Sequence, residues 1–204
     1  ALTLSSANVN LAAKTADFKS FNTQKDALIA SGVRIYGPGA SVAQDLEPEY
    51  ITVSADGKTA YVTLQENNAL AIVDVATAKV TSIKPLGYKD HSLTGNGLDA
   101  SDKDNAVNIR TWPILGMYLP DAIASYSVAG QTYLITANEG DARADWPGYN
   151  EEARVKELTL SPALEAFKSD AQLGRLNVTT SLGAVNGVHE KLYAYGTRSF
   201  SIWN

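Results

Sequence analysis

Oxygen-bearing side chains are the groups in this sequence most able to do chemistry, and they gather in three sets. The first set stands where two expected strands begin, and comprises Glu47, Glu49 and Asp121. Carboxylates that converge on one axis suit a hard cation such as Ca²⁺ or Mg²⁺, which prefers oxygen ligands. The competing interpretation is that they are solvated groups at strand ends, as most acidic side chains are.

A loop flanked by glycine carries the second set, in which oxygen side chains recur at short intervals. Its members are Asp99, Ser101, Asp102, Asp104 and Asn105. These residue types suit a calcium loop. The spacing is not that of an EF-hand, because no Gly stands at the sixth position and no Glu at the twelfth. The stretch is therefore either a calcium site of another kind or a solvated turn.

An arginine interleaved with carboxylates marks the third set. It comprises Asn138, Glu139, Asp141, Arg143 and Asp145. Arg143 could hold the loop through a bidentate salt bridge. Alternatively it could bind a phosphate or sulfate beside a metal, which would make it a catalytic candidate. Asn138, Glu139 and Asp141 are further candidate metal ligands.

The sequence holds two histidines, His91 and His189. His91 follows Tyr88-Lys89-Asp90 in a polar stretch and is a candidate for acid–base work, although a lone histidine is more often structural. His189 stands in the expected turn 183–190, where it should be exposed to solvent. No Ser-His-Asp set can be assembled, and no Gly-x-Ser-x-Gly elbow, phosphate loop or dinucleotide fingerprint occurs.

The elements that would position these groups are clearest between residues 47 and 87. Four short apolar runs follow one another there, separated by polar turns: Ile51–Val53, Thr59–Leu64, Leu70–Val73 and Lys79–Ile83. Asp56-Gly57 is a tight-turn signal, because Gly accepts the positive φ that such a turn needs. Four antiparallel strands in about forty residues are the size of one propeller blade.

The remaining segments predict a mainly β, partial β-propeller of four-stranded antiparallel blades with short helical insertions. Residues 1–46 read as an inter-blade insertion with helical stretches at 17–21 and 23–30, ended by Gly32. Residues 47–118 hold the first blade and a long connection without regular structure from 88 to 115. Residues 119–204 hold a second blade, with strands at 121–127 and 131–137, and the start of a third.

That second blade is expected to carry a long insertion. The loop runs from Asn138 to Asn150, with short helices at 151–158 and 162–167 after it. Strands are expected at 175–181, 191–195 and 198–203. Since a propeller needs four to eight blades to close, we read the chain as part of a longer protein whose remaining blades are its partners.

Meander geometry predicts where the candidate groups lie. In a blade, the start of the first strand, the second turn and the link to the next blade fall on one face. That rule gathers Glu47, Glu49, Asp121, the turn 65–68 and the loop from Asn138 around the mouth of the central channel. The opposite face receives only short turns. The sequence therefore predicts one acidic, functional face.

The repeat resembles a YVTN-type propeller repeat, through Ser-x-Asp-Gly-Lys, Tyr-Val and Ala-Thr-x-Lys-Val. The chain as a whole resembles the middle portion of choice-of-anchor I family proteins, in stretches that include 32–38, 87–91, 111–113, 137–142 and 198–203. These are bacterial extracellular propeller proteins, some of them labelled alkaline-phosphatase-like. The resemblance implies a propeller at the cell surface or outside the cell, with the periplasm as an alternative.

Composition and charge argue against several classes of binding partner. The net charge of −5 gives no basic footprint for nucleic acid, and no apolar run approaches the roughly 18 residues of a membrane span. The absence of cysteine rules out a disulfide framework and thiol chemistry.

Three functions stay open on these grounds. The chain could bind an unidentified small molecule or surface ligand on its acidic face, with Ca²⁺ stabilising the loops. It could be a metal-dependent, alkaline-phosphatase-like phosphoesterase, in which bound metal activates water and Arg143 or His91 assists. Finally, it could be a structural module of a larger surface protein.

Overall fold

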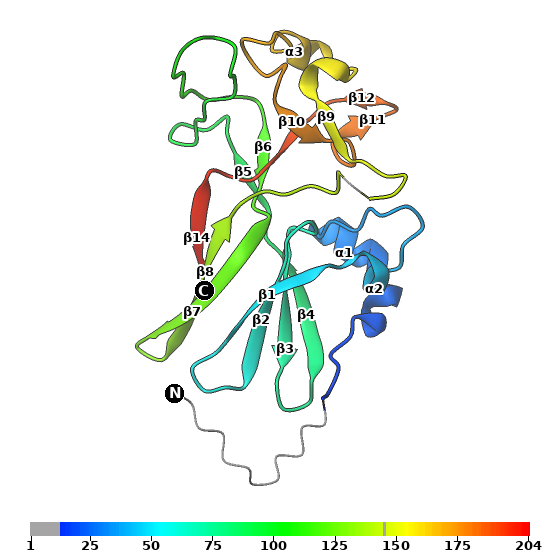
Figure 1. Ribbon diagram of the computed structural model, residues 1–204, viewed down its shortest axis with the longest axis vertical. Helices are drawn as coiled ribbons and strands as arrows, with labels where there is room; N and C mark the ends of the chain where they lie inside the picture. Colours follow the sequence, from blue (N-terminus) through cyan, green and yellow to red (C-terminus); the bar gives the residue numbers. More distant parts are fainter. Residues whose placement is uncertain (1–12, 145) are drawn as a thin grey trace.

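The computed structural model describes residues 13–144 and 146–204. Asp145 of the third set and the first twelve residues of the 1–46 segment lie outside the described residues. Figure 1 shows two blade-like sheets in the lower half of the view, and a further sheet with its covering segments above them. The predicted mainly β fold with short helical insertions is confirmed.

The first blade is an antiparallel meander with strand order β1-β2-β3-β4. Its strands are β1 (Pro48–Val53), β2 (Thr59–Leu64), β3 (Ala69–Asp74) and β4 (Lys79–Pro85). Gly57 has a φ of 73° in the turn between β1 and β2, which is the positive-φ conformation that the Asp-Gly pair predicts. The blade predicted from residues 47–87 is confirmed.

Short helices precede this blade and cover one side of it (Figure 1). They are the 3₁₀ helix η1 (Lys19–Gln24), α1 (Lys25–Ser31) and α2 (Val42–Asp45). Gly32 ends α1 in the left-handed region, with its N–H bonded to the last carbonyls of the helix. Phe21, Leu28 and Val42 pack with Leu64 and Ala71 in one apolar cluster, which fixes the helices to the blade.

The second blade has strand order β14-β8-β7. It comprises β7 (Pro120–Val128), β8 (Gln131–Asn138) and β14 (Ser199–Trp203). The last strand pairs with β8 along its whole length, from Ser199 opposite Asn138 to Trp203 opposite Leu134. Residues 198–203 therefore extend the second blade and do not open a third one.

The first strands of the two blades lie against each other. The hydroxyls of Thr52 in β1 and Ser125 in β7 are 3.0 Å apart, and Ser125 also donates to the Val53 carbonyl at 2.8 Å. Thr63 donates to the Asp121 carbonyl at 3.2 Å. The starts of β1 and β7 are thereby held near each other.

A third sheet was not foreseen from the sequence. Its order is β5-β6-β13-β10-β9, and β13 runs parallel to β6 while the other pairs are antiparallel. The strands are β5 (Tyr88–Asp90), β6 (Leu115–Met117), β9 (Glu152–Arg154), β10 (Asn177–Thr179) and β13 (Tyr193–Tyr195). The connection between the blades is therefore not structureless at its two ends.

The predicted helix at 151–158 is wrong. Residues 152–154 pair with β10 as β9, and only the 3₁₀ turn η2 (Val155–Glu157) follows. Long-range pairing to β10 overrides a local helical preference, which is a weak determinant. The predicted helix at 162–167 is present as α3 (Pro162–Glu165), and the small hairpin β11 (Ala184–Val185) and β12 (Val188–His189) follows β10.

Candidate functional site

Carboxylates from four separate segments meet on one face of the two blades. Two come from the start of β1, one from the β2–β3 turn, one from the start of β7 and two from the loop after β8. We call this set the acidic rim. Its members are Glu47, Glu49, Glu66, Asp121, Glu139 and Asp141. The structure thus brings together the strand starts and second turns that the meander rule placed on one face.

Glu49 shows how close this gathering is. Partial desolvation and the charges of Glu66, Asp121, Asp141 and Glu139 raise its pKa to about 7, from an ordinary value of 4.5. A like charge nearby disfavours ionisation, so the rim retains protons that isolated carboxylates would lose.

Glu66 is the buried member of the rim. Its side chain sits in the β2–β3 turn with 7% of the residue exposed, and its Oε2 has no hydrogen-bond partner among the described residues. Burial and the adjacent Glu47 raise its pKa to about 7. A buried carboxylate oxygen without a partner is costly when charged, so it is an available ligand for a cation.

Arg143 lies beneath the rim and is bound on several sides. Its Nη1 donates to Asp45 Oδ1 at 3.1 Å, and its Nε lies 3.0 Å from Glu47 Oε1. The guanidinium also stacks over Tyr36, 4.3 Å from the ring centroid. With a side chain 1% exposed, Arg143 pairs with two different carboxylates and not with one in a bidentate bridge, and it offers no open edge to a phosphate.

A second buried arginine extends this network. Arg34 pairs with Glu151 and donates from Nη1 to the Glu66 carbonyl at 2.7 Å. Glu151 also accepts the Tyr36 hydroxyl at 2.7 Å and the Arg143 N–H at 3.1 Å. The two ion pairs join the segment before β1 to the loop after β8, and so they hold the rim in place.

Asn138 is engaged inside the second blade. Its amide donates to the Ser199 and Ser201 hydroxyls at 3.1 and 2.8 Å, and its oxygen accepts the Thr136 hydroxyl at 2.9 Å. The side chain therefore ties β14 to β8.

The carboxylates of the 99–105 loop bind protein partners, which are Arg175 for Asp102 and Asn108 for both Asp99 and Asp104. Asp102 makes a two-pronged ion pair with Arg175, and the Arg175 guanidinium lowers the pKa of Asp102 to about 2. Asp104 Oδ2 accepts the Asn108 amide at 3.3 Å, and Asp99 Oδ2 accepts the Asn108 N–H at 3.3 Å. The loop is ordered by protein contacts, with one Asp99 oxygen left over.

His91 is buried inside the turn that it begins. Its Nδ1 lies 2.6 Å from the Asn96 carbonyl, and burial lowers its pKa. A Cβ on Gly116 would stand 2.7 Å from His91 Nε2, so the ring fills the space left by that glycine. These contacts give His91 a packing role. His189 is 7% exposed in β12 and is not the solvated residue that was expected.

The acidic rim can attract cations, although its carboxylates do not form a ready-made cage. No three His, Cys, Asp or Glu side chains among the described residues are placed to hold one metal ion together. Calcium accepts six to eight oxygen ligands. Backbone carbonyls, amide oxygens and waters can supply them in addition to carboxylates. The donor set therefore fits calcium better than zinc, which takes a tight set of nitrogen and sulfur ligands.

Comparison with known proteins supplies the family. The family model of the choice-of-anchor I domain matches residues 2–204. The chain belongs to this family. The family indicates a surface-associated, anchor-type domain. No helix among the described residues is long and apolar enough to cross a membrane.

Other comparisons add little to this family assignment. No curated protein matches the chain. Among solved structures, the chain is similar to hydrazine synthase of Kuenenia stuttgartiensis, with 20% identity over 48% of this chain and 31% of that chain, and a TM-score of 0.23. A TM-score this low places no constraint on the fold or function of this domain.

Sequence reasoning missed the residues that hold the site together. Arg34, Asp45, Glu66 and Glu151 were not singled out, although each is a charged residue with at most 7% exposure. Glu66 could have been found, because it stands in a second turn that the meander rule already assigned to the functional face. Glu151 could not, since its partners lie up to 117 positions away.

Proposed function

We propose that this surface-associated domain binds a positively charged ligand or partner through its acidic rim, and that Ca²⁺ stabilises the rim. The supporting observation is the buried Oε2 of Glu66, which has no hydrogen-bond partner in the part of the chain that the structure describes, beside the crowded carboxylate of Glu49. Both groups hold protons near neutral pH that a cation would displace. A cation bound at the rim would also offset the mutual repulsion of its carboxylates.

Thermal melting with and without calcium tests this proposal. An ion that binds only the folded chain stabilises it by mass action, by about 2.7 kcal/mol at a hundred times its Kd. For a chain of this size we expect CaCl₂ to raise Tm by about 5–10 °C over an EDTA baseline at pH 7.5. Magnesium should raise it less, because Mg²⁺ demands a near-ideal octahedral site.

Matched variants locate the effect. Glu49→Gln should remove most of the calcium-induced rise in Tm, whereas Asp26→Asn, which removes an exposed carboxylate from α1, should leave it intact. Equal Tm values in CaCl₂ and EDTA would count against calcium. A rise that survives Glu49→Gln and Glu66→Gln would place the ion elsewhere and would refute the rim as its site.

A further inference from the structure

A second candidate site adjoins the acidic rim, where the five-stranded sheet meets the second blade. The pocket has a volume of about 780 Å³ and is bounded by β9, β10, the 97–109 loop and the segment that leads into β14. Volumes of about 300–1,000 Å³ are typical of sites for small molecules. Glu139 is the one residue that also belongs to the rim.

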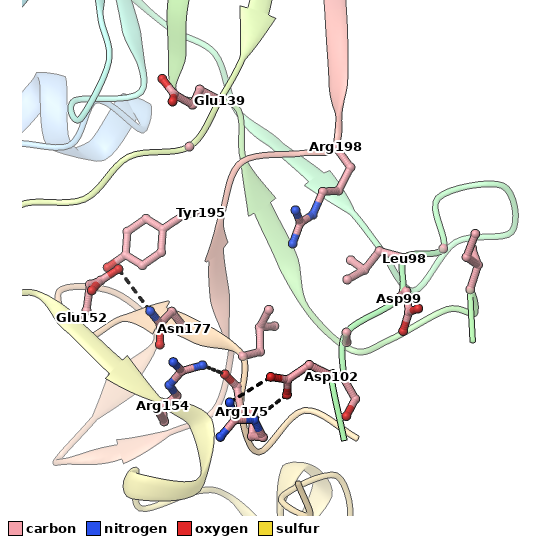
Figure 2. Close-up of a pocket in the computed structure, with 16 residues that line it drawn as sticks. Leu98, Asp99, Asp102, Glu139, Glu152, Arg154, Arg175, Asn177, Tyr195 and Arg198 are labelled. Carbon is pink, nitrogen blue, oxygen red and sulfur yellow. Dashed lines mark hydrogen bonds and ion pairs between the residues drawn. The ribbon is translucent and has the colours of Figure 1, made fainter. Parts of the chain in front are cut away.

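Both hydrogen-bond donors and acceptors line this pocket. Figure 2 shows Arg198 extending from the chain before β14 into the space between Tyr195 and Leu98, with Asp99 at one side and Glu152 at the other. Neither Arg154 nor Arg198 forms an ion pair with a carboxylate among the described residues. The third arginine of the lining, Arg175, is neutralised by Asp102.

Two buried polar atoms in the lining have no internal partner. These are Asp99 Oδ1, an acceptor, and the Tyr195 hydroxyl, both without a hydrogen bond among the described residues. Burial raises the pKa of Tyr195, so its hydroxyl remains a donor at neutral pH. Buried polar atoms are almost always satisfied in native proteins, so the described part of the fold leaves one acceptor and one donor unused beside this pocket.

The backbone beside this pocket is strained at one residue and closely packed at another. Arg198 has a φ of 53°, in the left-handed region where a side chain costs about 1–2 kcal/mol. Just before it, Gly196 crosses Gly140 so closely that a Cβ on Gly140 would stand 2.1 Å from the Gly196 nitrogen. Strain of this kind concentrates at functional sites, and here it sets the direction of the Arg198 side chain.

We propose that this pocket binds a neutral mono- or disaccharide. The lining carries the guanidinium groups of Arg154 and Arg198 as well as the carboxylates of Asp99, Glu139 and Glu152, so it has no single sign of charge that would select an anion or a cation. A sugar hydroxyl donates to a carboxylate and accepts from a guanidinium at the same time. Leu98 and Leu176 supply apolar surface for the carbon face of a ring.

Saturation-transfer NMR with the chain tests this proposal against a fixed panel: glucose, galactose, mannose, N-acetylglucosamine, maltose and cellobiose. The same panel includes two charged sugars, the anion glucuronate and the cation glucosamine. We expect at least one neutral sugar to bind at about 1 mM, which corresponds to roughly −4 kcal/mol. Binding by none of the neutral sugars, or tighter binding of a charged one, would overturn the proposal.

Variants that preserve the fold assign the signal to the pocket. Tyr195→Phe removes a hydroxyl that has no internal partner, so Tm should not fall while sugar affinity drops several-fold. Arg198→Gln should abolish binding, and Arg110→Gln, which removes an exposed arginine outside the pocket, should preserve it. Affinity unchanged in both pocket variants would refute the assignment. The calcium response of the acidic rim should persist in all three, so the two sites can fail independently.

Discussion

At the scale of single residues, the raised pKa values of two carboxylates make the stability of the folded chain depend on pH. Glu66 and Glu49 titrate near pH 7 in the folded chain, against an ordinary value of 4.5. Between those values the folded state binds more protons than the unfolded state, so its stability falls as pH rises through that window. Without calcium, we expect Tm to be lower at pH 8 than at pH 5, apart from contributions of other groups.

The Glu66→Gln variant isolates the buried contribution to this slope. At pH 8 the variant removes a buried charge without a partner, so we expect it to stabilise the chain in EDTA by about 1–3 kcal/mol, given about 1.4 kcal/mol per pKa unit. At pH 5 the wild-type carboxyl is protonated and the gain should vanish. Melting curves of both proteins at the two pH values measure the difference. An equal effect at both values would show that the Glu66 charge is not its cause.

Glu151 should behave in the opposite way, because its charge is fully paired. Its carboxylate is 0% exposed and bonds to Arg34, Tyr36, Thr179 and the Arg143 N–H. Glu151→Ala would leave the Arg34 charge buried and uncompensated, which typically costs about 3–5 kcal/mol. Urea unfolding measures this loss. Exposed Glu157→Ala in η2 is the matched control, with an expected loss below 1 kcal/mol.

At the scale of elements, the close crossing of Gly140 and Gly196 beside the proposed sugar pocket is critical for stability. Gly130 serves as the comparison. Gly140 and Gly130 both have positive φ, at 92° and 82°, so a Cβ strains both backbones alike. Only Gly140 faces neighbouring backbone, with Gly196 N at 2.1 Å from an added Cβ, whereas nothing lies within 4 Å of one on Gly130. We expect Gly140→Ala to destabilise the chain by at least about 2 kcal/mol more than Gly130→Ala, because overpacking adds to the strain. Equal losses in chemical denaturation would contradict this close crossing.

Sequence patterns predicted the elements that are stabilised locally. The Asp56-Gly57 turn and the alternation of 59–64 specify a meander by themselves, and Gly32 specifies the end of α1. They could not predict β9 or β6, since three-residue strands gain their order from partners far away in the chain. Asn177 pairs with Arg154 and Tyr193 pairs with Leu115, and no local signal encodes either pairing.

The site was predictable to the same extent. The rule that assigns alternate turns to alternate faces placed Glu49, Asp121 and Glu139 together, because it needs only the order of strands within a blade. It could not tell that Arg143 and His91 are buried, because their burial depends on segments that pack over them. Burial of a polar side chain by a distant insertion has no signature in its own neighbourhood.

At the scale of the whole molecule, apolar side chains are exposed on one edge strand of each blade. Phe200 and Ile202 in β14 are 68% and 54% exposed, and Ile51 and Val53 in β1 are 56% and 44% exposed. The partners inferred from the sequence, further blades of a longer protein, stay a prediction, and such blades would cover these faces.

Proton release on calcium binding tests the central claim, that scattered carboxylates converge on one rim that takes a cation. Titration calorimetry at pH 7, repeated in buffers of different ionisation enthalpy, counts the protons. With Glu49 and Glu66 each about half protonated at that pH, we predict release of about one proton per calcium ion. Calcium binding without proton release, or no binding heat in any buffer, would contradict the account.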